Sequence, residues 1–369
     1  MNQRKVPFGF FGAHTDRYTA MSVETMDREF ALMRECGVER LRVTFFWNHI
    51  QLWYAPRYRG AIHAVSDFIR PDAIVGAAAR AGLEMVGTVW GAPPWATGGL
   101  RPGEKSRFAF TAFGGVPEHS EDLANFMQDL VERYGPQGTL WAQHPDIPAQ
   151  PIRIWQPWQE PDRPAFMPQP FDVPYFVEMA HACYQAVKAV DPDAVVLGTG
   201  IGPAAADSPE LLDSIYRAGY RGAADAVALH VFPRNADSLL AAIRMNREVM
   251  AKHGDGQLPV VMSQLSYSSA LGKSRIAQPN PNMYDEAGQA EQVAETLMAL
   301  ARHREELNIF GAWYHGWSGL DEEPPAPRSP DPWLFTGLRK VLPDGGMASK
   351  PALHAYREVA LALEGKQGN

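Results

Sequence analysis

One stretch of the chain reads Ile152-Arg153-Ile154-Trp155-Gln156-Pro157-Trp158-Gln159-Glu160-Pro161-Asp162. It starts as a short apolar run, residues 152–155, and then turns polar and proline-rich, as a buried strand does where it ends. Seven similar runs lie along the chain, at residues 8–12, 41–45, 83–89, 194–198, 226–230, 260–264 and 309–314. Segments of helical periodicity separate them, which is typical of βα units around a parallel sheet.

Eight strands, each followed by a helix, favour closure of the sheet into a barrel. We therefore predict an α/β fold, a (β/α)8 TIM barrel with enlarged βα loops, in which residues 1–369 form one catalytic-type domain. The helices show one apolar stripe each, as in the run Val23, Met26, Phe30 and Met33. Another helix is expected to open at Pro71 and to close before Gly82.

Composition narrows the class of partner. Hydrophobic residues make up 46% of the 369 residues and charged residues 21%, a balance typical of a soluble globular protein. A formal net charge of −8 argues against nucleic acid and anionic membranes as partners, because no basic stripe is available. No apolar run reaches the length of a membrane span, so we expect a cytoplasmic protein with reduced cysteines at Cys36 and Cys183.

The segments after the strands are long and aromatic at residues 91–120, 161–174, 265–289 and 315–337. In a barrel they share the C-terminal rim, where barrel enzymes place their sites. Nine tryptophans fall at or beyond strand ends: Trp47, Trp53, Trp90, Trp95, Trp155, Trp158, Trp313, Trp317 and Trp333. Flat aromatic faces stack on the C–H faces of sugar rings, but a tryptophan can equally pack beneath a loop.

The quoted stretch resembles the Trp-Asn-Glu-Pro signature of the clan A glycoside hydrolases, with family 39 nearest among the subgroups. The resemblance extends to Arg42 and Trp47, to Pro94-Trp95-Ala96, to Lys188–Pro192, to His230 and to Lys350-Pro351-Ala352. It implies that Glu160 is the general acid/base of a retaining mechanism acting on a small β-linked glycoside or oligosaccharide. The flanking tryptophans independently predict a raised carboxyl pKa for Glu160.

The resemblance also implies a nucleophilic Glu at the end of the seventh strand, and this chain has Gln264 there. Retaining hydrolysis needs two carboxyl groups about 5–5.5 Å apart, and an amide has no anionic oxygen to attack with. Two neighbours depart from the pattern as well. Gln159 stands where the clan has an Asn that binds the sugar 2-hydroxyl, and Phe232 stands where it has a Tyr that supports the nucleophile.

Three explanations of Gln264 stay open. It is an engineered Glu-to-Gln exchange that stops turnover, or the mark of a natural sugar-binding protein without hydrolysis, or a sign that another rim carboxylate has been recruited. The candidates for that last role are Asp16, Asp162, Glu322 and Glu323. The distance of the recruited base from Glu160 would then determine whether the product anomer is inverted or retained.

The predicted catalytic positions are therefore Glu160 and Gln264, and the predicted substrate-binding residues are Arg42, Trp47, Trp95, Gln159, His230, Tyr267 and Trp313. For His230 the resemblance implies a role in orienting the catalytic pair or a sugar hydroxyl, although a strand-end histidine is often only a core residue. Arg42 lies in an apolar strand, so it needs a buried partner.

Other site chemistries find little support in the sequence. The run Gly198-Thr199-Gly200-Ile201-Gly202 imitates the start of a dinucleotide fingerprint but lacks its final glycine, and Pro203 interrupts the helix entry. No zinc, phosphate-loop or serine-nucleophile pattern occurs. We expect no cofactor and no catalytic metal, and the sequence leaves the oligomeric state undetermined.

Overall fold

Eight parallel strands close into one barrel in the order β1 to β8, and the predicted barrel fold is thereby confirmed. The computed structural model describes residues 3–15, 17–51, 66–97, 115–202, 208–276, 280–322 and 330–366. The strands are β1 (Phe11–His14), β2 (Arg40–Phe46), β3 (Glu84–Trp90), β4 (Ile154–Pro157), β5 (Val195–Ile201), β6 (Ala226–Val231), β7 (Val260–Leu265) and β8 (Ile309–His315). Pairing of β1 with β8 closes the cylinder.

Each predicted apolar run overlaps one of these strands, with local shifts. The first prediction begins too early, because Gly9 adopts a φ of 76° and the amide of Phe10 bonds back to Pro7, so a turn precedes β1. Strand β4 lies two residues later than predicted. Strand β5 runs three residues further, past Gly200 with its φ of 58° and a register shift against β6.

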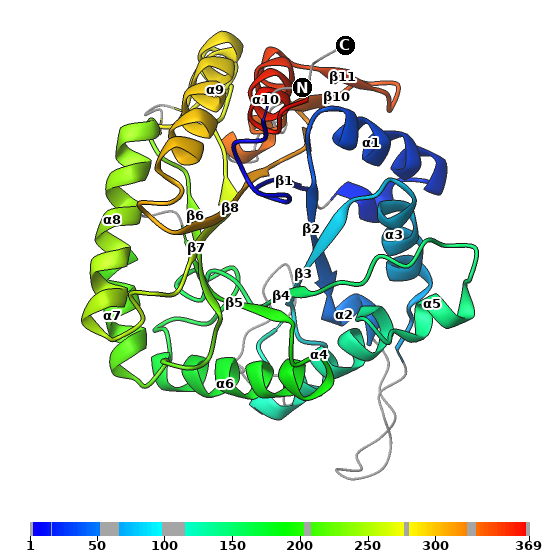
Figure 1. Cartoon of the computed structure of the whole chain (residues 1–369), viewed down its shortest axis with the longest axis vertical. Coiled ribbons are helices and arrows are strands. Elements are labelled where there is room, and N and C mark those ends of the chain that lie inside the picture. The colour runs from blue at the N-terminus through cyan, green and yellow to red at the C-terminus, as the bar shows by residue number, and fades with distance from the viewer. Residues whose placement is uncertain are drawn as a thin grey trace.

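Helices surround the barrel in a ring (Figure 1). They are α1 (Val23–Glu35), α2 (Trp47–Ile50), α3 (Ile69–Arg80), α4 (Ser120–Tyr134), α5 (Thr139–Gln143), α6 (Val173–Val190), α7 (Ser208–Arg217), α8 (Ala236–Lys252), α9 (Glu286–His303) and α10 (Pro351–Leu363), with 3-10 turns η1 (Arg17–Ala20) and η2 (Pro332–Phe335). The stripe of α1 buries Met26, Phe30 and Met33, while Val23 is exposed. Helix α3 begins two residues before Pro71.

The inside of the barrel is a packed apolar layer. Its buried members come from alternate positions of six strands: Val86, Ile154, Leu197, Ala226, Ala228, Val261 and Trp313. The Trp313 indole needs glycines on its own and the next strand, since a Cβ at Gly12 would come within 2.4 Å of its ring and one at Gly311 within 2.9 Å. Two residues further along these strands, the inward-facing positions become polar, as at Gln156 after Ile154 and His230 after Ala228. These buried polar side chains form a layer at the C-terminal mouth.

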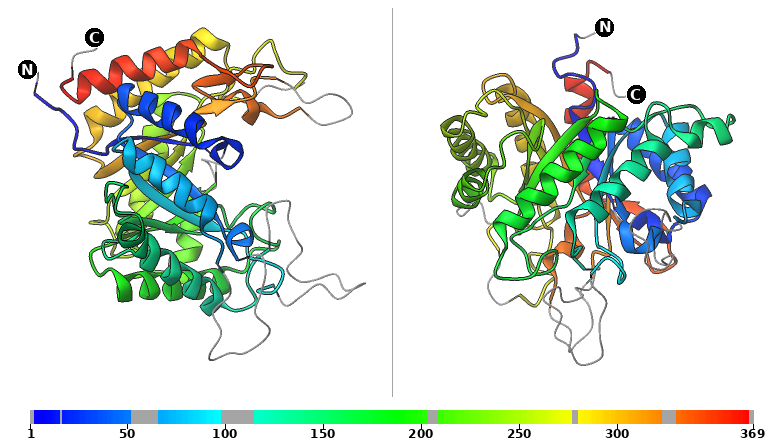
Figure 2. Two further views of the ribbon diagram at one scale, coloured as in Figure 1. Left: turned by 90° about the vertical axis from the view of Figure 1, so that its right-hand side faces the viewer. Right: turned by 90° about the horizontal axis from the view of Figure 1, so that it is seen from below.

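Beyond β8, a small sheet of β9 (Ser318–Gly319), β10 (Arg339–Val341) and β11 (Met347–Ser349) precedes α10. It lies on the side of the barrel away from the chain ends, as the left view of Figure 2 shows. The amide of Lys5 bonds to the carbonyl of Leu363, so both terminal segments lie together. Within the described ranges, no helix combines the length and apolarity that crossing a membrane requires.

Candidate active site at the mouth of the barrel

Glu160 follows β4 in an unusual backbone conformation. Trp158 and Glu160 have φ values of 67° and 43°, in the left-handed region that non-glycine residues rarely adopt. Backbone bonds hold this turn: the Trp158 amide donates to Val89, and the Glu160 amide donates to Gly200 over 2.8 Å. Strain of this kind costs about 1–2 kcal/mol per residue and is typical of functional sites. The turn aims the Glu160 carboxyl into the mouth.

There the carboxyl meets His230. Oε1 of Glu160 lies 2.6 Å from Nδ1 of His230, whose side chain is fully buried. Burial raises the pKa of Glu160 to about 7, against the opposing positive charges of Arg163 and Arg42. Burial, with Arg42 adding to the effect, lowers the pKa of His230 well below its ordinary value. At neutral pH the contact is therefore a hydrogen bond to a neutral imidazole, and Glu160 is protonated in a substantial fraction of molecules, unlike an ordinary Glu.

Arg42 organises a layer of side-chain amides beside this pair. Its guanidinium donates from Nε to Oε1 of Gln156 over 3.0 Å and from Nη2 to Oε1 of Gln159 over 2.8 Å. Nε2 of Gln264 donates to the same Gln159 oxygen over 3.3 Å. Because His230 and Gln264 are register partners in β6 and β7, the amide layer and the Glu160–His230 pair meet at one mouth. Positions 160 and 264 thus lie at the same end of the barrel.

Two histidines from neighbouring strands complete the polar layer and were missed by the sequence analysis. Nδ1 of His14, at the end of β1, lies 2.8 Å from Nδ1 of His315, at the end of β8, and the rings stack. His14 also contributes, after the larger causes, to lowering the pKa of both Glu160 and His230. Strand parity was an available signal, since the Trp313 ring lies inside the barrel against Gly12 and each histidine follows one of these residues two positions later.

Three of the predicted sugar-binding aromatics, Trp47, Tyr267 and Trp313, have fully buried side chains. Trp47 is fully buried, stacked on Phe126 with its Nε1 bonded to Gln51. Trp313 belongs to the apolar layer inside the barrel.

Tyr267 is fully buried too, and its hydroxyl lies 2.6 Å from Oγ1 of Thr296 on α9. None of these three side chains has a surface with which to touch a ligand. Trp95 is half-buried, and its Nε1 donates to the carbonyl of Gln51.

Packing also accounts for most of the remaining tryptophans. Trp90, Trp155, Trp158 and Trp317 are buried, and Trp53 lies outside the described residues. Trp333 differs, because 40% of its surface is exposed on η2. Phe232, at the position where the resemblance implies Tyr, packs against the Trp333 ring with centroids 4.3 Å apart.

The four carboxylates considered as recruited bases fare differently. Asp16 and Glu323 lie outside the described residues, and Glu322 is exposed. Oδ1 of Asp162 accepts the amide of Gly202 over 3.1 Å, and Oδ2 lies 3.2 Å from Nε of Arg163. Burial raises the pKa of Asp162, and the nearby negative charge of Glu160 adds to this shift.

The two lysines that carry part of the resemblance, Lys188 and Lys350, form ion pairs with aspartates. Lys188 pairs with Asp225 over 2.9 Å at the opposite end of the barrel, and Lys350 is buried against Asp321.

A cavity of about 490 Å³ lies at the end of the barrel opposite the mouth, lined by Arg153, Asp191 and other side chains. The converging polar side chains of the mouth, and not this cavity, mark the candidate site. No cluster of three or more metal-ligating side chains occurs in the described part of the chain.

Comparisons with solved structures reproduce the fold. The chain is similar to a monomeric beta-xylosidase from Caulobacter crescentus CB15, with a TM-score of 0.64, 18% identity, and coverage of 96% of this chain and 69% of that one. A family 39 glycoside hydrolase from Bacteroides cellulosilyticus WH2 gives a TM-score of 0.62 at 16% identity, covering 98% and 64%. An exo-beta-1,4-mannosidase from Opitutaceae bacterium strain TAV5 gives 0.61 at 17%, covering 96% and 59%.

The chain therefore spans less than two thirds of the second and third of these proteins. No family model matches it, and no curated protein matches it in sequence. At these identities the likeness concerns the fold: the chain has the barrel architecture found in glycoside hydrolases.

Proposed function

We propose that this chain is a glycosidase scaffold that binds a small β-linked glycoside or oligosaccharide at the C-terminal mouth of the barrel, with Glu160 protonating the glycosidic oxygen. The observation that carries the proposal is the buried hydrogen bond between Glu160 and neutral His230. With a pKa near 7, a substantial fraction of the Glu160 carboxyl carries its proton at neutral pH, where an ordinary Glu would be ionised, and can pass it to a leaving alkoxide.

Residue 264 determines how far the reaction proceeds. In double displacement a second carboxylate attacks the anomeric carbon while the first protonates the leaving oxygen. The Gln264 amide cannot replace the attacking carboxylate, because its oxygen carries no negative charge and the lone pair of its nitrogen is delocalised into the carbonyl. That nitrogen donates to Gln159. The chain therefore holds the acid and the sugar-binding polar layer without the nucleophile, and a carboxylate at 264 is expected to complete a retaining pair.

The test is hydrolysis of aryl β-glycosides by the purified chain and by Gln264→Glu, with the product anomer followed by NMR. We expect the unchanged chain to be inert and Gln264→Glu to release product with retention. The control is the double variant Gln264→Glu/Glu160→Gln. It should lose hydrolysis of aryl glycosides with poor leaving groups, because these need a general acid to protonate the leaving oxygen. Retention by the unchanged chain would contradict the account of Gln264.

Absence of hydrolysis by Gln264→Glu, with sugar affinity that Glu160→Gln leaves intact, would instead favour a sugar-binding protein that does not hydrolyse its ligand. The hydrogen bonds among Arg42, Gln156, Gln159 and Gln264 support this second candidate, because the Gln264 amide takes part in them.

If Asp162 serves as the catalytic base, the expected product is different. Its carboxylate is held by Gly202 near Glu160, and a base about 6.5–9.5 Å from the acid activates water for inversion. Inverted product from the unchanged chain, abolished by Asp162→Asn, would replace the arrested-nucleophile account with this one.

A further inference from the structure

Three aromatic side chains gather at one side of the mouth, and we call Trp333, Phe232 and His315 the rim aromatic group. The Phe232 and Trp333 rings meet edge to face, with centroids 4.3 Å apart and planes at 69°. His315 contacts both, at 5.9 Å from Phe232 and 6.5 Å from Trp333. The group joins the ends of β6 and β8, so it spans the end of the strand between them, β7, which carries Gln264.

The rim aromatic group borders the polar layer directly. Phe232 stands two residues after His230, the partner of Glu160, and two residues of chain span at most about 7 Å. On the other side, His315 lies 2.8 Å from His14 through the two Nδ1 atoms. A ligand that reaches Glu160 therefore has an apolar wall beside it on the β6–β8 side.

We propose that Trp333, backed by Phe232 and His315, is a stacking platform for the C–H face of a pyranose ring whose glycosidic oxygen points to Glu160. This inference rests on the proposed function and adds the recognition element. A large aromatic ring with 40% of its surface exposed beside a hydrogen-bonding site suits a ligand that is apolar on one face and polar at its edge. Pyranosides with equatorial hydroxyls offer such a face.

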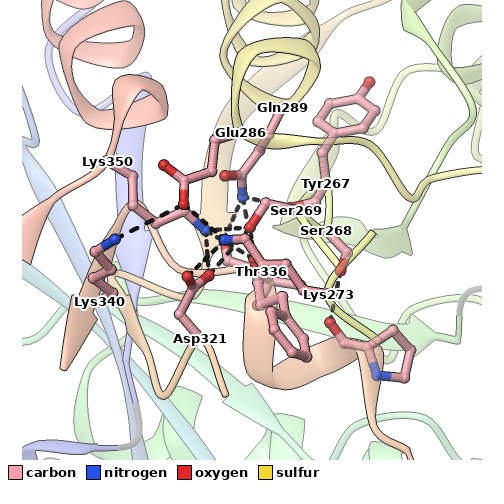
Figure 3. Close-up of polar contacts among 12 residues, drawn as sticks. Tyr267, Ser268, Ser269, Lys273, Glu286, Gln289, Asp321, Thr336, Lys340 and Lys350 are labelled. Carbon is pink, nitrogen blue, oxygen red and sulfur yellow. Dashed lines mark hydrogen bonds and ion pairs between the residues drawn. The ribbon is translucent and has the colours of Figure 1, made fainter. Parts of the chain in front are cut away.

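A buried polar cluster fixes the segment that carries the platform (Figure 3). Oγ of Ser268 donates to the carbonyl of Pro332 over 2.8 Å at the start of η2. At its end, Nζ of Lys350 donates to the carbonyl of Phe335 over 3.1 Å, and Nε2 of Gln289 donates to that of Thr336 over 3.2 Å. Bonds at both ends hold η2, and with it Trp333, in one position.

The ammonium of Lys350 is the centre of this cluster. Its side chain is fully buried and contacts Oδ1 of Asp321 at 3.0 Å and Oγ of Ser269 at 2.7 Å. The amide of Asp321 in turn donates to the carbonyl of Leu334 within η2. Lys350 therefore acts as a positioning residue for Trp333 and does not itself reach the mouth.

The experiment measures affinities of the full chain for cellobiose, xylobiose and mannobiose by calorimetry. We expect Trp333→Ala to weaken binding of the preferred disaccharide about tenfold or more, and Trp333→Tyr to retain most of it. Trp141→Ala is the matched control, because half-buried Trp141 lies on α5 at the opposite end of the barrel and should leave affinity unchanged.

Lys350→Met tests whether Lys350 positions Trp333 or only stabilises the fold. It should weaken binding in the unchanged chain and add little in the Trp333→Ala background, because both changes remove the same contact. Equal weakening in both backgrounds would overturn the positioning role.

Disaccharide binding that Gln159→Ala weakens but Trp333→Ala leaves intact would overturn the platform and leave the proposed function standing. Failure of every disaccharide to bind the unchanged chain would overturn both.

Discussion

Gln264 and Gln159 are joined by a hydrogen bond from amide to amide, and the accepting oxygen of Gln159 is the one that Arg42 also holds. Position 264, where a retaining glycosidase needs a negatively charged carboxylate, thus holds a neutral amide in a layer of amides around the buried Arg42 guanidinium.

Arg42 should be the main source of stability in the layer. Arg42→Met leaves the oxygens of Gln156 and Gln159 without their strongest donor, and each unsatisfied buried group costs about 1–3 kcal/mol. We expect the unfolding free energy to fall by roughly 2–4 kcal/mol in denaturant titrations. Arg80→Met, which removes an exposed pair with Asp27, is the control and should cost at most about 1 kcal/mol. Equal losses for the two variants would contradict the role of Arg42.

The raised pKa of Glu160 should appear in stability against pH. The folded state holds this proton up to about pH 7, while an unfolded Glu loses it near 4.5, so folding is progressively penalised as pH rises between these values. Glu160→Gln removes the titration and should raise the unfolding free energy by about 2–3 kcal/mol at pH 8, with little change at pH 4. A gain that is the same at both pH values would show that the carboxyl is not perturbed.

Catalysis by Gln264→Glu should lose its acid on the alkaline side. Because Glu160 must be protonated to act, kcat/KM is expected to fall as pH rises through about 7 or higher, since the new carboxylate raises the pKa of Glu160 further. His230 stays neutral through this range. The measurement is a pH profile of aryl glycoside hydrolysis, and a fall centred near pH 4.5 would exclude Glu160 as the acid.

Gly200 should matter for contact as well as for backbone conformation. Its φ is 58°, and a Cβ there would lie 2.6 Å from Nε2 of Gln156 in the amide layer. Gly222 also has a positive φ, 86°, but a Cβ there meets nothing within 4 Å.

Both alanine variants should therefore lose about 1–2 kcal/mol of unfolding free energy through the left-handed backbone. Gly200→Ala, unlike Gly222→Ala, should lose more unfolding free energy than this, because its Cβ would collide with Gln156. It should also weaken disaccharide binding. If calorimetry gives both variants the same affinity, the layer does not touch the ligand.

The fold was predictable because strand periodicity and apolar runs report burial directly. The site was predictable only in part. Gln159 and Glu160 follow β4, while Arg42 and Gln264 lie within β2 and β7. The sequence located these strands to within a few residues, and a closed barrel brings them together.

The aromatic residues were harder to assign, because adjacency to a strand end does not tell which side of the chain a ring occupies. Trp313 turned out to fill the barrel over Gly12, and Trp333, within a long loop, took the exposed position through contacts distant in sequence. Strand parity indicates that His14 and His315 each face the mouth, but their contact joins residues 301 positions apart, and no local pattern pairs them.

The most direct test of the central claim is a crystal structure of the chain soaked with a β-linked disaccharide. We predict that the glycosidic oxygen will lie within hydrogen-bond distance of the Glu160 carboxyl, with the anomeric carbon facing the Gln264 amide. A sugar bound elsewhere, or one in the mouth with its glycosidic oxygen turned away from Glu160, would contradict the account.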